Sequence, residues 1–139
     1  MDKKIKIISQ SPAETKKLAQ KILAQNPKIL ILTGELGAGK TVFVKGLAKV
    51  LHIKEPVTSP SFVIIKEYQN QKKLVHIDLY RIDKPDLDLI GQITEYLHNP
   101  ETILAIEWGE KILPFLPKEK TKIIKFKILN EKERQIEIY

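Results

Sequence analysis

Apolar residues along the chain follow two different patterns, and their succession predicts an α/β fold. Short apolar runs are typical of buried strands, whereas apolar positions three and four residues apart form one face of a helix. The clearest run lies at residues 28–33, where four consecutive apolar residues indicate a strand covered on both faces. Strands are expected on this basis at residues 4–8, 28–33, 62–68, 74–79, 102–106, 122–129 and 134–138.

Helix signals lie between these strands. Ser11, Pro12 and Glu14 occupy the N-cap, first and third positions of an expected helix, an arrangement that satisfies the free amides of a first turn. A second helix is expected to begin at Thr41, and a third is expected within residues 83–99.

Two pairs of strands are joined by short polar connections, at residues 69–72 and 130–133, which predict β-hairpins. Because hairpin strands are antiparallel and strands joined through a helix are usually parallel, the sheet should have mixed strand directions. The length of 139 residues is that of one domain, which we expect to span residues 1–139.

The amino-acid composition is typical of a globular protein and excludes several kinds of site. The chain is 42% hydrophobic and 29% charged, as is usual for globular proteins, and no apolar run approaches the roughly 20 residues that span a bilayer. Cysteine is absent, which excludes disulfides, thiolate metal ligands and a cysteine nucleophile. We therefore expect a cytoplasmic protein that does not bind a membrane.

The net charge of +7 raises the question of a nucleic-acid partner. The positive charge is almost entirely lysine, because Arg81 and Arg134 are the only arginines, whereas direct base readout relies on the planar guanidinium group. Lysine is frequent along the whole chain, so a solvated basic surface explains the charge at least as well as a partner does.

The strongest motif is the segment Gly34-Glu-Leu-Gly-Ala-Gly-Lys-Thr41, which fits the phosphate-loop pattern G-x-x-x-x-G-K-[ST] in full. Its glycines let successive backbone N–H groups turn toward phosphate oxygens at the start of a helix. Lys40 is then expected to reach the β- and γ-phosphates and Thr41 to bind Mg²⁺. The motif lies between a buried strand and a helix, as required, and it predicts nucleotide binding within a three-layer P-loop NTPase-like fold, a mixed central sheet flanked by helices.

Two acids follow apolar strands and are candidates for catalysis or metal binding. Asp78 ends one strand and Glu107 ends another. Strand ends beside a phosphate loop gather at one edge of such a sheet, so both acids are expected near the nucleotide. Spacing alone leaves open which of them contacts Mg²⁺, and each also fits a surface carboxylate at a strand end.

Other positions near these motifs are less specific. Thr58 and Ser59 lie in the loop after the second helix, where NTPases often sense the γ-phosphate, although turn chemistry also explains this sequence. His76 alternates within an apolar strand and is expected to be packed rather than catalytic. Trp108, beside Glu107, is interpreted as a core aromatic or a lid.

Taken in order, the segments GELGAGKT, VTSPSF, LVHIDLYRI and LAIEWGEKI resemble the bacterial TsaE (YjeE) family. Members of this family are small P-loop ATPases needed to make threonylcarbamoyladenosine next to the anticodon of tRNAs. The resemblance extends from Ser11 to about Arg134. Many families share the phosphate loop, but the H-x-D-L-Y-R and E-W elements at these distances make the match specific.

The resemblance implies a role for several residues. Thr41 and Glu107 look like the magnesium ligands, and Asp78 corresponds to the aspartate on which ATPase activity depends. Thr58 and Ser59 lie in the segment similar to the family's switch, and two further positions, Ser11 and Arg134, fall where the family borders the nucleoside. The phosphate-loop residues implied to bind ATP are Glu35, Leu36, Gly37, Ala38, Gly39, Lys40 and Thr41.

The family resemblance implies an accessory role, in which ATP and Mg²⁺ serve TsaD and TsaB family proteins and tRNA is engaged only indirectly. Asp78 would position or deprotonate the attacking water, and Lys40 would act on the phosphates. Neither of the two arginines is clearly placed as a finger, although Arg81 stays open for that role, so turnover by the isolated chain is expected to be slow.

Three alternatives remain at this stage. A small P-loop kinase is disfavoured because two arginines hardly supply the guanidinium clamps of a kinase lid. A GTPase is disfavoured because residues 83–86 only approximate the guanine-reading motif and come too early in the chain. A non-catalytic, nucleotide-gated binding module uses the same residues as an ATPase, so the sequence separates these two poorly.

Overall fold

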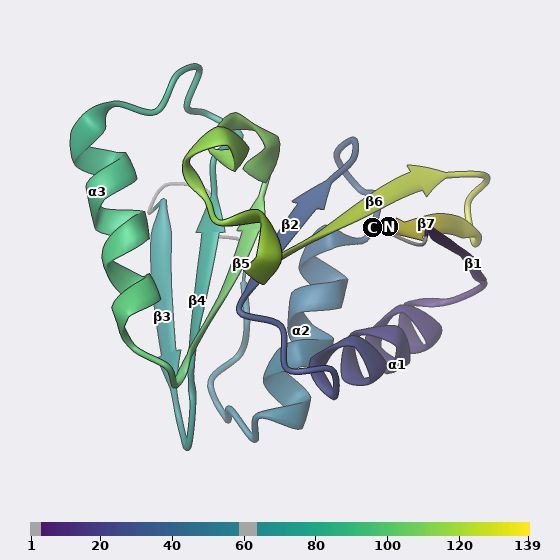
Figure 1. Ribbon diagram of the computed structural model, residues 1–139. Coiled ribbons are helices and arrows are strands. Elements are labelled where there is room, and N and C mark those ends of the chain that lie inside the picture. Colours follow the sequence, from purple (N-terminus) through teal and green to yellow (C-terminus); the bar gives the residue numbers. More distant parts are fainter. Residues whose placement is uncertain (1–3, 59–63) are drawn as a thin grey trace.

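The computed structural model describes residues 4–58 and 64–139 and contains one sheet of seven strands in the order β1-β7-β6-β2-β5-β4-β3 (Figure 1). β2 lies in the centre of the sheet, between β6 and β5. The strands are β1 Ile5–Ser9, β2 Ile29–Thr33, β3 Ile65–Gln69, β4 Lys73–Asp78, β5 Thr102–Glu107, β6 Thr121–Ile128 and β7 Arg134–Ile138.

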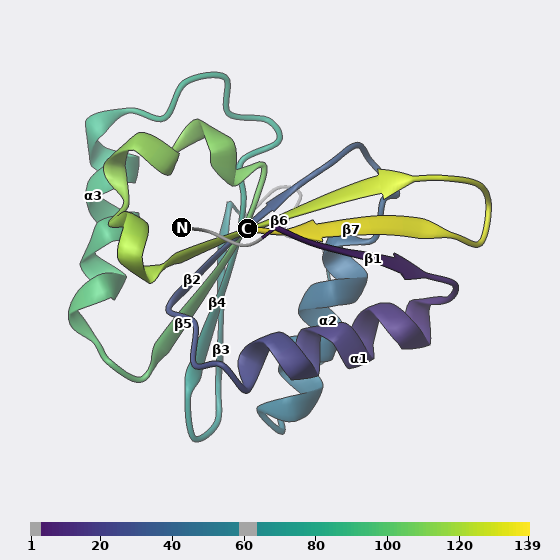
Figure 2. The same ribbon diagram turned by 45° about the vertical axis from the view of Figure 1, so that its right-hand side comes forward.

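Helices cover the two faces of this sheet in separate layers. α1 and α2 pack on one face, and α3 lies on the other with a series of short 3₁₀ turns (Figure 2). The α-helices are α1 Pro12–Leu23, α2 Lys40–Val50 and α3 Leu87–Glu95, and the 3₁₀ turns are Tyr96–His98, Gly109–Lys111, Leu113–Phe115 and Lys118–Lys120. The three-layer α/β architecture expected from the sequence is confirmed.

Strand directions are mixed, as predicted from the two hairpins. β2 is parallel to both β5 and β6, and β4 is parallel to β5. The hairpin pairs β3–β4 and β6–β7 are antiparallel, and β1 adds an antiparallel edge beside β7. The carboxyl ends of the four parallel strands β2, β4, β5 and β6 therefore point to the same edge of the sheet.

Alternation along the strands divides the core into two halves. In β2, Leu30 and Leu32 pack toward α1 and α2, while Ile29 and Ile31 pack toward α3. All four side chains are fully buried. This two-sided burial explains why the strand appears in the sequence as an unbroken apolar run.

The predicted capping residues begin the helices as expected. Ser11 is the N-cap of α1, where its hydroxyl accepts from the backbone N–H of Glu14 at 3.2 Å. The Glu14 carboxylate in turn accepts from the backbone N–H of Gln10 at 3.1 Å, which completes a reciprocal cap. Asp86 caps α3 in the same way through the N–H of Leu89.

Several strand ends differ from the sequence prediction by one residue, and larger differences lie at β3 and after α3. β3 begins at Ile65, and residues 62 and 63 of the expected strand lie outside the described residues. The third helix tightens into a 3₁₀ turn after Glu95, because the chain must turn before Pro100 to enter β5. After β5 the chain forms two 3₁₀ turns in succession, Gly109–Lys111 and Leu113–Phe115.

Candidate functional site

The glycine-rich segment after β2 curls sharply before α2 begins. Gly34, Gly37 and Gly39 have φ angles of +138°, +78° and +107°, values that residues with side chains rarely adopt. Gly39 is the N-cap of α2 and has no side chain to cap the helix. The free amides of this helix start are therefore available to an anion.

Gly34 also allows the segment to pass close to β6. A Cβ atom at this position would lie 2.4 Å from the backbone oxygen of Phe126, which is too close for any side chain. Further along, Ala38 is fully buried, whereas Leu36 is 62% exposed. The segment is thus anchored against the sheet at its start and is open to solvent at its tip.

Lys40, the phosphate-loop lysine, is buried and held by its own loop. Its Nζ donates to the backbone oxygens of Gly34 and Glu35, the second at 3.0 Å, and lies 4.4 Å from the centre of the Trp108 ring. Burial lowers the pKa of Lys40 from its usual 10.5, while nearby carboxylates, Glu107 foremost, act in the opposite direction. An ammonium held mainly by neutral groups would gain from an anionic ligand.

Glu107 joins the phosphate-loop helix to the neighbouring strand. Its Oε2 atom accepts from the Thr41 hydroxyl at 3.1 Å and lies 2.5 Å from Nε2 of His76. Both Glu107 and His76 are almost completely buried. An ionised carboxylate can only accept, so with Glu107 ionised this bond requires Nε2 of His76 to donate. The carboxylate is therefore held from two sides, by α2 and by β4.

Asp78 lies directly beside Glu107. The two residues are register partners at the carboxyl ends of the parallel strands β4 and β5. One carboxylate oxygen of Asp78 accepts from the backbone N–H of Tyr80 at 2.9 Å. The sheet thus brings together the two acids that the sequence analysis singled out, at the edge where the phosphate loop begins.

His76 is the residue whose contribution the sequence analysis missed. It is packed, as expected, but it also binds the carboxylate of Glu107. The alternation of side chains along β4 could have revealed this contact. Leu74 faces α1 and α2, and the residues two and four positions later face the same way. A polar side chain on that face, two residues before Asp78, points toward the phosphate-loop helix rather than into a purely apolar layer.

Ser11 and Arg134, far apart in the sequence, line one cavity of about 340 Å³ beside α2. Thr15 and Val42 contribute to the same cavity. Arg134 also donates to the backbone oxygen of Gly37 at 3.3 Å, which connects the cavity to the phosphate loop. Ser11 is a helix cap and Arg134 binds hairpin carbonyls, so each residue combines a structural contact with a place at the cavity.

The hydroxyl loop is only partly described. Thr58 accepts from the Lys66 side chain at 3.2 Å, and its backbone N–H donates to the hydroxyl of Tyr68 at 3.4 Å. Both partners belong to β3. Ser59 lies outside the described residues. A switch role for this loop stays a prediction.

Comparison with known proteins identifies the family. The family model for the threonylcarbamoyl adenosine biosynthesis protein TsaE matches residues 9–136. The chain belongs to the TsaE family. Membership places it in tRNA threonylcarbamoyladenosine biosynthesis, and the matched segment includes every candidate residue.

Several TsaE relatives match over nearly the whole chain. The tRNA threonylcarbamoyladenosine biosynthesis protein TsaE of Aquifex aeolicus is 43% identical over 96% of this chain and 94% of its own length. The Bacillus subtilis protein of the same name is 39% identical over 96% of this chain and 84% of its own. A crystal structure of B. subtilis YdiB superposes with a TM-score of 0.79 at 38% identity, covering 99% of this chain and 86% of that one.

The described part of this TsaE chain contains no helix long and apolar enough to cross a membrane.

Proposed function

We propose that this TsaE chain binds ATP with Mg²⁺ and hydrolyses it slowly, as an accessory to the proteins that form threonylcarbamoyladenosine on tRNA. The observation that carries the proposal is the convergence of Lys40, Thr41, Asp78 and Glu107 at the carboxyl edge of the parallel strands. A phosphate loop followed by paired carboxylates is the arrangement that phosphoryl transfer requires.

The oxygen donors near the loop fit a magnesium ion. The Thr41 hydroxyl and the Glu107 carboxylate already lie 3.1 Å apart, and hard oxygen ligands of this kind suit Mg²⁺. Within the described residues, no group of three or more His, Cys, Asp or Glu side chains forms a metal site by itself. Such an ion would therefore take further ligands from phosphate and water, and when bound it supplies positive charge to the phosphate oxygens.

In this proposal, residues of the chain have separate roles in ATP binding and hydrolysis. Lys40 leaves its carbonyl partners to bind phosphate oxygens, and the free amides at the start of α2 bind the same anion. Asp78 positions or deprotonates the attacking water, while His76 keeps the Glu107 carboxylate in place. In the cavity beside α2, Ser11 and Arg134 border the nucleoside.

We expect slow turnover because the chain has only two arginines, Arg81 and Arg134, to supply a finger. Arg134 donates to a hairpin carbonyl and to the backbone oxygen of Gly37. A missing arginine finger lowers phosphoryl-transfer rates by about 10³ to 10⁵. The remaining stabilisation is expected to come on association with TsaD and TsaB family proteins.

The test is phosphate release from ATP by the purified chain, alone and with TsaD and TsaB from the same organism. We expect stimulation by the pair and a loss of about 10²-fold or more in Lys40→Ala and Asp78→Ala. Lys45→Ala, an exposed change on α2, and Asp88→Asn, on α3, are matched controls that should keep parental rates.

Two results would contradict the proposal. Unchanged phosphate release in Lys40→Ala would show that the phosphate loop is not used for turnover. Tight ATP binding without turnover in either condition, with full biological activity in Asp78→Asn, would favour a nucleotide-gated binding module instead.

A further inference from the structure

A second charged region lies at the opposite end of the parallel strands. Residues 118–127 contain five lysines and one glutamate, a net +4 of the chain's +7. This segment forms the last 3₁₀ turn and most of β6. Three of these lysines, Lys118, Lys120 and Lys122, lie just before β6 or at its start, at the amino end of that strand.

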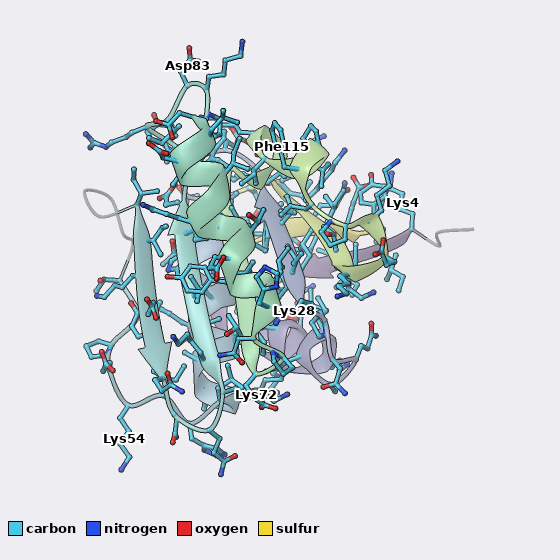
Figure 3. All side chains as sticks on the ribbon, turned by 60° about the vertical axis from the view of Figure 1, so that its left-hand side comes forward. Lys4, Lys28, Lys54, Lys72, Asp83 and Phe115 are labelled. Atoms are coloured by element: carbon cyan, nitrogen blue, oxygen red, sulfur yellow. The ribbon has the colours of Figure 1, made fainter. Side chains whose placement is uncertain are left out.

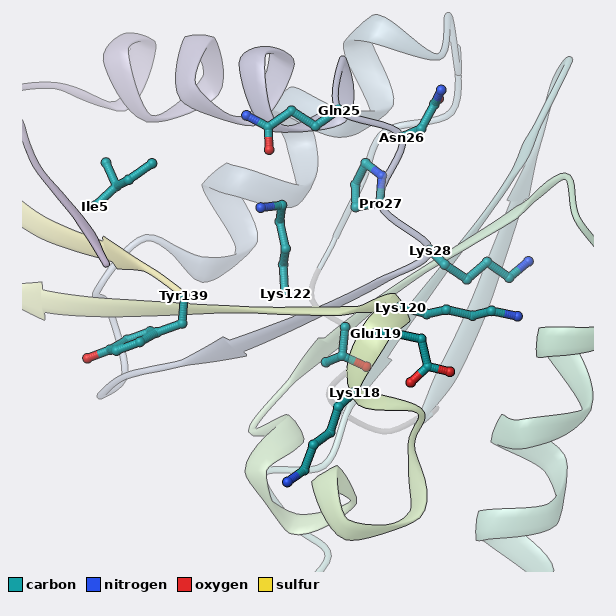
Figure 4. Close-up of a pocket in the computed structure, with 11 residues that line it drawn as sticks. Ile5, Gln25, Asn26, Pro27, Lys28, Lys118, Glu119, Lys120, Lys122 and Tyr139 are labelled. Atoms are coloured by element: carbon teal, nitrogen blue, oxygen red, sulfur yellow. The ribbon is translucent and has the colours of Figure 1, made fainter. Parts of the chain in front are cut away.

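The fold adds a lysine from elsewhere in the sequence. Lys118, Lys120 and Lys122 line a cavity of about 610 Å³ together with Lys28, which immediately precedes β2. Figure 4 shows the side chains of Lys28 and Lys120 extending in the same direction, each from the residue that precedes one of the neighbouring strands β2 and β6. Like charges placed side by side repel, so an anion bound beside them would lower that repulsion.

The four cavity lysines lack the carboxylate partners that would neutralise them. Within residues 4–58 and 64–139, none of them lies within 4.0 Å of a carboxylate oxygen. Burial and the charge of Lys120 lower the pKa of Lys28, while Glu101 acts in the opposite direction. Glu119 also lines the cavity, so the local charge remains clearly positive.

An aromatic ring extends the basic region along the sheet. Tyr139 lines the same cavity, and the ammonium groups of Lys125 and Lys4 lie 5.0 and 5.5 Å from the centre of its ring. Basic grooves that bind single-stranded nucleic acids combine lysines for the phosphates with aromatic rings on which bases stack. Lysine rather than arginine implies backbone contacts with little base specificity.

We propose that this lysine cavity, with Tyr139 beside it, binds the phosphate backbone of single-stranded RNA directly. RNA is the expected polyanion because the TsaE family functions in tRNA modification. The cavity lies at the amino ends of β2 and β6, whereas the phosphate loop follows the carboxyl end of β2, roughly 17 Å of strand away. RNA binding is therefore independent of the proposed ATP site and of ATP turnover.

The experiment is fluorescence anisotropy of a short labelled single-stranded RNA titrated with the full chain between about 50 and 200 mM salt. Four lysine contacts predict that log K falls against log salt with a slope of about −3. The triple variant Lys118→Ala, Lys120→Ala, Lys122→Ala should bind at least about tenfold more weakly and reduce the slope to about −1.

Matched variants distinguish the effect of the cavity lysines from the effect of the protein's net charge. Lys49→Ala, Lys54→Ala and Lys84→Ala remove the same net charge from exposed positions outside the cavity, and Figure 3 shows Lys54 well away from Lys4 and Lys28. This control triple should retain most of the affinity. Tyr139→Ala should weaken binding about fivefold or more without changing the slope, while Tyr139→Phe should not.

The outcomes distinguish RNA binding in the cavity from a general charge effect and from a protein interface. Equal losses in the two triples would overturn the proposal in favour of a general charge effect. No RNA binding by the parent, with loss of TsaD and TsaB association in the cavity triple, would make this region a protein interface instead. Lys40→Ala should bind RNA as the parent does, so failure of the ATPase proposal and failure of this one are distinguishable.

Discussion

Charged side chains at the two ends of the parallel strands differ in their burial and in their bonding partners. At the carboxyl ends, Lys40, His76 and Glu107 are no more than 4% exposed, and each bonds to another group of the protein. At the amino ends, Lys118 and Lys120 are exposed, and within the described residues neither forms an ion pair.

This contrast shows how one sheet can present two kinds of electrostatic surface. Buried charges cost desolvation energy unless partners hold them in place, so the carboxyl edge is fixed in geometry and sensitive to single changes. Exposed lysines keep their hydration and rotamer freedom, so the amino end tolerates single changes and acts through summed charge. The predictions below test that difference, from the largest effect to the smallest.

The largest effect is expected for Gly34→Ala at the carboxyl edge. The new Cβ would meet the backbone oxygen of Phe126 at 2.4 Å, and the φ of +138° is unfavourable for alanine. We expect the free energy of unfolding to fall by about 3 kcal/mol or more, measured by urea unfolding.

Gly91→Ala is the matched control for that change. Gly91 lies within α3, where an added Cβ meets nothing within 4 Å. Alanine there should raise the free energy of unfolding by roughly 0.5–1 kcal/mol. Equal effects of the two substitutions would show that the phosphate loop is not tightly fixed against β6.

An intermediate effect is expected for His76→Phe, which keeps a ring but removes the donor to Glu107. A buried carboxylate that loses one of its two partners should cost about 1–3 kcal/mol of unfolding free energy. We also expect ATP binding to require more Mg²⁺, because Glu107 is no longer held from β4. Calorimetric titration of ATP at several Mg²⁺ concentrations measures this.

Thr102→Val, at the amino end of β5, is expected to have the opposite effect on stability to His76→Phe. The Thr102 hydroxyl is buried, and it has no hydrogen-bond partner among the described residues. Its removal should be neutral or stabilise the fold by up to about 1 kcal/mol. A marked loss of stability in this variant would mean that the hydroxyl has a partner, and the contrast with His76 would disappear.

The smallest effect is expected for the exposed pair of Glu67 and Lys73 near the amino end of β4. A hydrogen bond from Lys73, 2.8 Å away, lowers the pKa of Glu67 below its usual 4.5, and Tyr96 adds a second bond at 2.9 Å. Burial and the same carboxylate raise the pKa of Tyr96 to about 12. Glu67→Gln should therefore cost less than about 1 kcal/mol at neutral pH.

The sign of the pH dependence follows from the lowered pKa. Glu67 is ionised more readily in the folded chain, so its contribution is present above pH 4.5 and is lost as the pH falls through the lowered value. Urea unfolding of the parent and Glu67→Gln should differ at neutral pH and converge once the pH falls below the lowered pKa of Glu67. A constant difference across this range would contradict the assignment.

Local signals in the sequence predicted most of the elements. Ser11, Pro12 and Glu14 marked the start of α1 because capping depends on residues within one turn. The apolar run of β2 and the two hairpins indicated a mixed sheet for similar reasons. The last turn after α3 was harder to predict because a helix and a 3₁₀ turn share nearly the same local signals.

By itself, then, the sequence determined the class of fold, the phosphate loop and the family, since these depend on periodicity, turn chemistry and motif spacing. Only the tertiary structure decided that His76 holds Glu107, that Ser11 and Arg134 line one cavity, and that Lys28 joins the lysines of β6. These contacts join residues 31 to 123 positions apart, and strand order and register bring them together. No local pattern encodes that order, because pairing between distant strands is set by how the whole core packs.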